Sequence, residues 1–296
     1  FGLSVLVLAA AAAVCSQVGL AQPARAEALS MVGERLRDVD IRIVSKVEPG
    51  RNDTWHADAL LIGETSSSPV RVTWRETDAG RSAPVVDIGM TARISGTATP
   101  ASGGERAVLS IWADLIEPRS QAPPALAVAA TLRDGLVSQA AAMPGDGGRL
   151  LPGLAVGDTR LVDARLDGRM TVTGLTHLLA VSGANCAVVA ALGWGIGWVF
   201  ALRRSLRVAL AAGALLCFVL LVTPEPSVVR ASMMAGIGMV AVLSGRGRDG
   251  VALLSLAVVV ALVFDPWLAT SIGFALSVAA TAALLLLAPP LAMRLR

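Results

Sequence analysis

The stretch MTVTGLTHLLAVSGANC, residues 170–186, opens a long apolar run that is rich in glycine and tryptophan. His177, Ser182 and Asn185 each cost free energy inside hydrocarbon unless they meet partners or water. Polar residues in such a segment are expected to face the interior of a helix bundle or a cavity. The stretch therefore predicts membrane helices with polar side chains between them.

The spacing of these polar residues does not fit one face of a helix. At about 100° per residue, His177 and Asn185 are roughly 80° apart, while Ser182 is roughly 140° from His177. Gly183 loosens the helix between them. We therefore expect a helix that is interrupted near residues 182–185, as in proteins that line a path through a bilayer.

The composition agrees with a membrane protein. Hydrophobic residues make up 54% of the chain and charged residues 16%, and the mean hydropathy is +0.67. An ordinary soluble domain is less apolar. Cys15, Cys186 and Cys217 lie in apolar stretches without ligand spacing, so we interpret them as buried thiols. We expect no metal and no cofactor.

The charges are distributed unevenly. Residues 22–170 hold 17 basic and 19 acidic side chains, net −2, whereas residues 171–296 hold 8 basic and 3 acidic side chains, net +5. Neutralising phosphates requires clustered Lys or Arg. A strong electrostatic grip on nucleic acid by the first of these regions alone is therefore not predicted.

The chain opens with an uncharged apolar run, residues 1–21, that is about long enough to span a bilayer. We predict a transmembrane helix. A secretory signal that ends near residues 24–26 is the alternative. The run lacks an initiating Met and a basic flank, so we expect the chain to be cut at its start.

Residues 35–118 are predicted to form a small OB-like Greek-key barrel, since short alternating segments are separated there by turn residues. The expected strands are residues 40–47, 54–62, 69–75, 87–96 and 106–116.

Two tryptophans of these strands are interpreted differently. Trp112 lies on the polar face of the last strand and is a candidate for base stacking. Packing against a loop is the alternative. Trp74 shares a face with Val70 and Val72 and is expected in the core.

Residues 119–170 are predicted to be a linker with one amphipathic helix. That helix, residues 125–143, has Leu132, Leu136, Ala140 and Met143 on one side, and it suits either the membrane surface or an ordinary packed position. The segment 145–158 is expected to be a turn-rich link. It is no nucleotide loop, because no Gly-Lys-Ser/Thr follows its glycines.

Residues 171–296 are predicted to be a transmembrane helix bundle. The apolar segments are residues 174–202, 208–223, 227–244, 251–264 and 266–288, and the fourth is short enough to be re-entrant. If all cross the bilayer, the basic loops at 203–207 and 245–249 and the basic C-terminus share one side. The positive-inside rule makes that side cytoplasmic, which leaves the barrel outside.

This topology gathers His177, Glu225, Arg230 and Asp265 near the outer membrane face. A pair between Arg230 and either Asp265 or Glu225 would tolerate charge at that depth. The functional interpretation is an outer vestibule at this membrane face. The alternative is that Arg230 extends to the interface and that Asp265 caps a helix.

Four stretches together resemble the ComEC-type competence proteins, the polytopic channels through which bacteria import single-stranded DNA. They are HLLAVSGAN (177–185), LLPGLAVGD (150–158), PSVVRA (226–231) and FDPWLATSIGFALS (264–277), in the order of that family. In the family a histidine is common where Asn185 stands. Gly273 and Ser277 belong to the last of these stretches.

The resemblance implies a DNA-uptake channel in the bacterial cell membrane, with an OB-like domain outside. The DNA path would include His177, Ser182, Gly183, Asn185, Glu225, Arg230, Asp265, Gly273 and Ser277. Its partners would be single-stranded DNA, lipid, a DNA receptor and an ATP-driven helicase or translocase of the competence machinery. The family has more helices than this chain, so we expect an incomplete bundle.

Two other classes of function fit parts of the sequence. A solute transporter or exporter with an external binding domain would need inverted repeats or a charged midplane site, and neither is visible. An intramembrane hydrolase would need His177 to activate Ser182, but the two diverge on a helix and no carboxylate lies near enough in sequence to orient the imidazole. His56 and His177 cannot build a metal-dependent nuclease site. We therefore expect no enzyme.

Overall fold

The computed structural model of the chain describes residues 2–50, 54–63, 67–75, 86–101, 106–175, 183–222, 226–245 and 250–294. The chain divides by its contacts into two compact units. The first unit comprises Phe1–Ala21, Gly183–Phe218 and Pro226–Arg296, and it holds the helix bundle. The second unit comprises Gln22–Ser182 and Val219–Glu225, and it holds a β-barrel.

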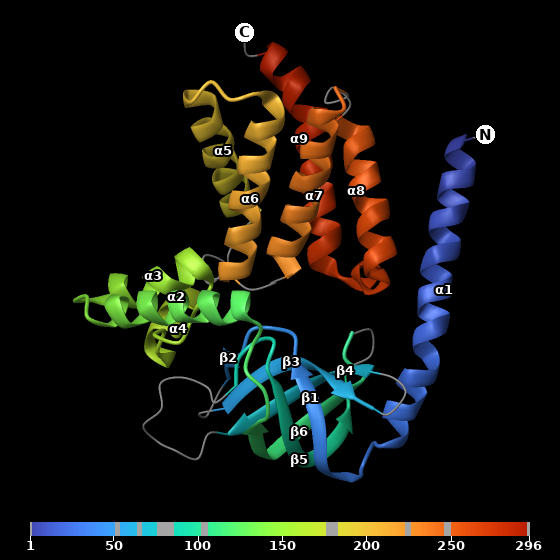
Figure 1. Ribbon diagram of the computed structural model, residues 1–296, viewed down its shortest axis with the longest axis vertical. Helices are drawn as coiled ribbons and strands as arrows, with labels where there is room; N and C mark the ends of the chain where they lie inside the picture. Colours follow the sequence, from blue (N-terminus) through green and yellow to red (C-terminus); the bar gives the residue numbers. More distant parts are fainter. Residues whose placement is uncertain are drawn as a thin grey trace. The chain divides into compact units, whose positions relative to one another are not determined.

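The barrel is a closed sheet of the OB-like type. Its strands are β1 (Arg35–Ile43), β3 (Thr54–Ile62), β4 (Ser67–Arg75), β5 (Thr91–Pro100) and β6 (Leu109–Pro118). The sheet order is β1-β5-β6-β4-β3, and β1 also pairs with β3, which closes the barrel. Only β4 and β6 pair in parallel among the described strands, and the short β2 (Glu48–Pro49) pairs antiparallel with β3 (Figure 1). The predicted small barrel is confirmed.

The core of the barrel follows from the alternation of side chains along each strand. Ile41, Ile43, Val70, Val72, Ile94, Leu109 and Ile111 are completely buried, and Trp74 is 1% exposed, as predicted. The predicted strand 54–62 has the bounds of β3. The first strand begins five residues earlier than predicted, because an irregular register between Leu36 and Val39 interrupts its alternation.

Helices precede and follow the barrel. The helix α1 (Gly2–Ser30) is longer than the predicted 1–21, and Ala28 near its end packs into the barrel core. After β6 come α2 (Pro124–Ala141), α3 (Asp146–Val156) and α4 (Ala164–Val172). The prediction of a turn-rich link at 145–158 is wrong. The glycines and Pro152 are tolerated in α3, which ends at Gly157 in the left-handed conformation, φ 70°.

The first unit is a bundle of helices that run alternately up and down (Figure 1). They are α5 (Gly183–Val199), α6 (Arg204–Val222), α7 (Pro226–Leu243), α8 (Gly250–Phe264) and α9 (Ile272–Arg294), with the short 3₁₀ helix η2 (Pro266–Thr270) before α9. The expected apolar segments are therefore helical, although α5 is described only from Gly183 onward. Within the described residues, α6 is the single helix long and apolar enough to cross a membrane.

The sequence predicts close helix packing at Gly195, Gly197, Gly236 and Gly238. A Cβ at Gly197 of α5 would stand 3.0 Å from the side chain of Arg207, and one at Gly193, which the sequence did not single out, would stand 2.9 Å from the backbone of Ala211. A Cβ at Gly195, Gly236 or Gly238 would have no described atom within 4 Å, so the structure gives these three glycines no close contact among the described residues. Small residues let α5 approach α6 closely.

Candidate functional site

One end of the bundle brings together several of the predicted site residues. The helices α5, α7 and α9 all begin at this end (Figure 1). A Cβ at Gly183, the first residue of α5, would stand 3.1 Å from Cβ of Ala231 in α7, and a Cβ at Gly273 in α9 would stand 3.4 Å from Nη2 of Arg230. Gly183, Arg230 and Gly273 therefore occupy one site.

The Nε atom of Arg230 is the polar atom of this site that has no hydrogen-bond partner among the described residues. The side chain is half-buried, and its Nε atom is buried without a hydrogen-bond acceptor among the residues that the structure describes. A buried N–H without an acceptor costs about 1–3 kcal/mol. The predicted pair with Asp265 is wrong, since the described ion pairs do not include it. Glu225 lies outside the described residues.

Asp265 has a structural role, which is to cap the turn that follows it. It precedes η2, and its Oδ1 accepts a hydrogen bond from the backbone N–H of Trp267 at 3.1 Å. This is the capping role that the sequence left open as the alternative. The described contact of this carboxylate is therefore within its own turn and not with Arg230.

Two further residues of the predicted DNA path, Asn185 and Ser277, lie near the N-termini of α5 and α9. Asn185 is half-buried in the first turn of α5. Ser277 is half-buried in α9, one turn beyond Gly273 and on the same face, and its carbonyl accepts a hydrogen bond from Thr281. His177 and Ser182 lie outside the described residues, so their roles stay predictions.

Trp112 stands on the outer face of the barrel with 43% of its surface exposed. Its neighbours in the sheet are Thr97 of β5 and Thr73 of β4, which are too small to cover an indole. Two positions along β6, Asp114 pairs with Arg35 at 3.0 Å. The exposed ring can stack on a planar group, so the base-stacking prediction keeps its geometric basis.

The outer face of the barrel carries balanced rather than positive charge. Arg93 donates to both carboxylate oxygens of Asp40 at 2.8 and 3.2 Å, and this hydrogen bonding lowers the pKa of Asp40. Arg71 pairs with Asp58 at 3.0 Å. Arginines held by carboxylates do not form a phosphate-binding patch, in agreement with the net charge of this region.

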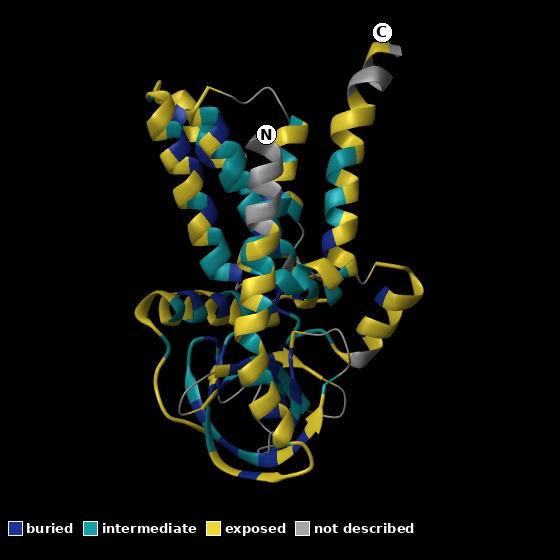
Figure 2. Cartoon of the chain, turned by 90° about the vertical axis from the view of Figure 1, so that its right-hand side faces the viewer, coloured by how far each residue is buried: buried dark blue, intermediate teal, exposed yellow. Residues whose placement is uncertain are grey.

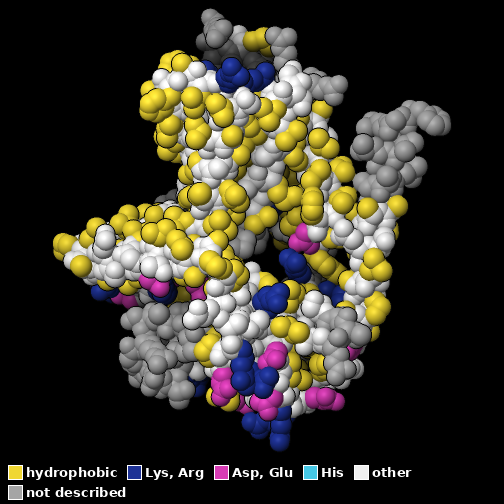
Figure 3. Space-filling model, viewed as in Figure 1, with side chains coloured by type: hydrophobic (Ala, Val, Ile, Leu, Met, Phe, Trp, Pro, Cys, Tyr) yellow, Lys and Arg dark blue, Asp and Glu magenta, His cyan; other side chains and the backbone are white. Residues whose placement is uncertain are grey.

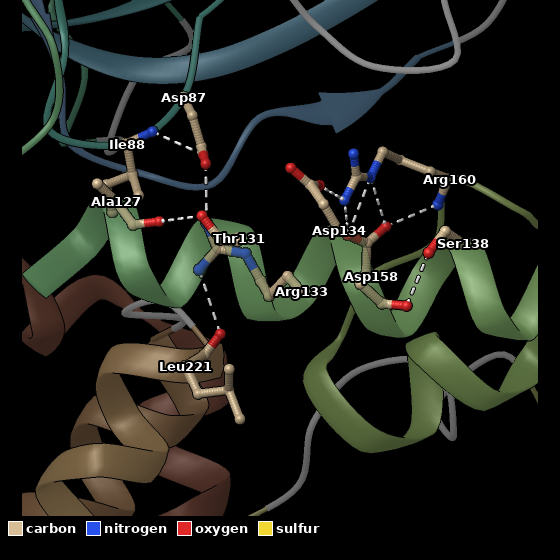
Figure 4. Close-up of polar contacts among 11 residues, drawn as sticks. Asp87, Ile88, Ala127, Thr131, Arg133, Asp134, Ser138, Asp158, Arg160 and Leu221 are labelled. Atoms are coloured by element: carbon tan, nitrogen blue, oxygen red, sulfur yellow. Dashed lines mark hydrogen bonds and ion pairs between the residues drawn. The ribbon is translucent and has the colours of Figure 1, made fainter.

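The helix α2 buries a side that the sequence did not predict. Ala129, Arg133 and Ala140 are buried, whereas Leu132 is 59% and Met143 49% exposed. Arg133 donates to Asp87 at 2.8 Å and to the carbonyl of Leu221 at 3.2 Å (Figure 4). Because this buried cation is satisfied by groups distant in sequence, the periodicity of α2 alone could not reveal it.

A second ionic cluster joins α2 to the segment after α3. Nη2 of Arg160 lies 2.7 Å from Oδ1 of Asp134 and 2.8 Å from Oδ2 of Asp158 (Figure 4). Burial raises the pKa of Asp158, but the hydrogen bonds from Arg160 outweigh it, and the pKa is lowered overall. Lys46 also donates to the carbonyl of Gly157. These contacts hold the helices after the barrel together.

An open cavity near this cluster has a volume of about 490 Å³ and is lined by charged residues, among them Asp146, Arg149, Asp163 and Arg165. Arg149 pairs with Asp163 at 2.6 Å, and Arg165 with Asp146 at 3.5 Å. Because the carboxylates neutralise the arginines, this cavity is a poor anion site. The described residues also contain no group of His, Cys, Asp or Glu that could hold a metal ion.

Comparison with known proteins identifies the family. A family model described as "Competence protein" matches residues 154–296. ComE operon protein 3 of Bacillus subtilis (strain 168) is 30% identical over 149 residues, which are 49% of this chain and 19% of that protein. The chain thus spans about a fifth of that relative's length, and no solved structure matches. The family model and this relative together support a ComEC-type competence protein with a competence domain at residues 154–296.

Proposed function

We propose that this chain is part of a membrane channel that takes up single-stranded DNA during natural transformation. Membership of the competence family supports a role in DNA uptake. The observation that carries the channel is the site formed by Gly183, Arg230 and Gly273, which lies within the family-matched residues and contains a cation without a described partner. The backbone of DNA supplies the acceptors that such a cation requires.

The site has a second feature that favours an anion. An α-helix carries roughly half a positive charge at its N-terminus. The helices α5, α7 and α9 all begin near Arg230. Their N-termini add to the positive potential of the guanidinium, and this potential would attract a phosphodiester at the mouth of a pore.

The proposed protein crosses the cell membrane several times. The helix α6 is long enough to span, and α5, α7, α8 and the apolar part of α9 are shorter apolar helices. A segment of about 17 residues is at the lower limit for a span. Arg203 and Arg204 lie at the opposite end of α5 and α6 from Gly183, so the positive-inside rule places that end in the cytoplasm. The barrel and residue 230 would then lie outside.

The barrel would present the strand to the channel. Trp112 offers a stacking surface that tolerates any base sequence, and the balanced charge around it predicts weak binding by the barrel alone. Lipid, a DNA receptor and an ATP-driven helicase or translocase are the proposed partners. The chain itself is proposed to conduct and not to catalyse.

Uptake of labelled DNA by cells that carry the full-length gene tests the proposal. Arg230→Ala should lower uptake by about tenfold or more, the loss of one strong charged contact. Arg204→Ala removes the same charge at the other end of the bundle and should leave uptake largely intact. His177→Ala belongs in the same series. Membrane abundance is measured for each variant, and normal uptake by abundant Arg230→Ala protein would refute the proposed path.

A further inference from the structure

Gly273 has no backbone reason to be glycine. It lies in the first turn of α9 and is absent from the residues with positive φ. In a helix, glycine is less favourable than alanine by roughly 1 kcal/mol. The reason must therefore lie in the space that a side chain would occupy.

That space is next to the guanidinium of Arg230. A Cβ at Gly273 would stand 3.4 Å from Nη2 and 4.0 Å from Cζ of Arg230, and 3.8 Å from Oγ of Ser271. These are ordinary contact distances, so alanine would fit while covering part of the guanidinium. The γ-carbons of valine reach further and would displace it. Gly273 itself is exposed, so the missing side chain leaves the guanidinium open on this side.

The open side presents Nη2, one of the two donors of the edge with which arginine binds oxyanions. Nε and Nη2 form a fork of parallel N–H donors that fits two oxygens of a carboxylate or phosphate. Arg93 uses this fork on Asp40 in the same chain, at 2.8 and 3.2 Å. In Arg230 the Nε is buried without an acceptor among the described residues, and Nη2 is the atom that faces Gly273.

We infer that Nη2 of Arg230 binds an oxygen of a phosphodiester group and that Gly273 is a positioning residue that keeps Nη2 accessible. The identity of the ligand as DNA rests on the proposed function. The role of Gly273 rests on the distances around it. The identity of the ligand and the role of Gly273 can fail separately, and the experiment below distinguishes the two failures.

The test compares Gly273→Val and Gly273→Ala with Gly238→Val and Gly238→Ala in the full-length protein. Gly238 lies in α7, where a Cβ would meet no atom within 4 Å, so these variants control for the change in helix propensity. One readout is uptake of labelled DNA relative to membrane abundance. The other is binding of a short single-stranded oligonucleotide to the purified protein in lipid nanodiscs at several salt concentrations.

We expect Gly273→Val to weaken oligonucleotide binding by about tenfold and Gly273→Ala by less, with Gly238 variants near wild type. Loss of one phosphate contact should also reduce the salt dependence, by roughly 0.7 in the slope of log K against log salt concentration. In an Arg230→Ala background, Gly273→Val should cause no further loss, because both changes remove the same contact.

Three results would overturn the inference. They are Gly273 and Gly238 variants with equal binding, an unchanged salt slope in Gly273→Val, or a full additional loss in the double variant. If Gly273→Val does not accumulate, Gly273→Ala carries the comparison, since its Cβ fits without displacement. A wild-type protein that neither binds nor takes up DNA would instead refute the proposed function and would leave the packing of Gly273 against Arg230 in place.

Discussion

The barrel and the helix bundle use apolar side chains in opposite ways. The barrel encloses many of them: Ile41, Val70 and Trp74 are at most 1% exposed, and Figure 2 shows buried residues along its strands. The bundle leaves many apolar side chains exposed. Four of them are each more than 60% exposed, namely Leu192, Trp198, Leu276 and Leu284. In Figure 3, hydrophobic side chains cover most of the visible surface of these helices.

This difference shows that the two regions are suited to different solvents. Burial of a leucine or isoleucine stabilises a fold in water by about 1.5–3 kcal/mol, and the barrel obtains its stability in this way. Exposed apolar patches as extensive as those on the bundle mark a protein or membrane interface. If lipid surrounds the bundle, close packing at positions such as Gly193 replaces the hydrophobic effect as the force between helices.

The largest expected effect concerns the buried cation beside the barrel. Arg133→Ala should destabilise the second unit by about 3–5 kcal/mol, because Asp87 is left without its partner next to buried groups. Arg35→Ala breaks an exposed pair with Asp114 and should change stability by about 0–1 kcal/mol. Protection of the chain from protease in a urea series measures both. Equal effects would show that Arg133 is not buried as described.

The next prediction compares matched leucines. Leu109→Ala in the barrel core should cost about 2–5 kcal/mol, since the side chain is completely buried. Leu284→Ala in α9 should cost far less, because 68% of that side chain is exposed. The same protease protection series on the detergent-solubilised chain gives the two values. A large loss for Leu284→Ala would mean that α9 is packed inside a protein core.

An arginine introduced on the surface of the bundle or of the barrel tests whether each surface faces lipid or water. Leu284→Arg should impair membrane insertion by about 2.5–3.5 kcal/mol if that side chain faces lipid. Leu115→Arg, on the barrel at 53% exposure, should be tolerated. Membrane-inserted protein is quantified by carbonate extraction of each variant. Normal insertion of Leu284→Arg would contradict the lipid-facing assignment.

The smallest expected effect is an acid-dependent loosening of the second unit. The pKa of Asp158 is lowered in the folded state, so the folded state binds fewer protons than the unfolded state. Its contribution is present above the unfolded pKa of about 3.9 and is lost as the pH falls through the lower folded value. Asp158→Asn should reduce the loss of protease protection that accompanies a fall in pH. Asp167→Asn, on exposed α4, should leave that loss unchanged. An unchanged loss in Asp158→Asn would argue against the Arg160 cluster.

Periodic features were predictable from the sequence, and contacts between distant residues were not. The bounds of β3 and the buried position of Trp74 follow from simple alternation. The burial of Arg133 depends on Asp87, 46 residues away, and no local pattern reveals it. The burial of one arginine on an otherwise apolar helix face can therefore be seen only in the folded structure.

The candidate site shows the same division. The alternation of apolar segments predicted Arg230 at one end of the bundle, and Gly273, which only the family resemblance singled out, lies beside it. Of the two partners predicted for Arg230, Asp265 caps the turn that follows it, which a count of charges does not show, and Glu225 lies outside the described residues. The helix α3 was missed because glycine and proline usually mark a link, although here they are contained in a capped helix.

Cysteine labelling tests the central claim, that the bundle faces lipid while the barrel faces water. In a chain without its native cysteines, Leu115→Cys and Leu284→Cys place one thiol on each surface, at 53% and 68% exposure. A water-soluble maleimide is added to intact membranes and again after detergent. We predict that Cys at 115 reacts in both conditions and Cys at 284 only after detergent. Rapid reaction at 284 in intact membranes would contradict the account.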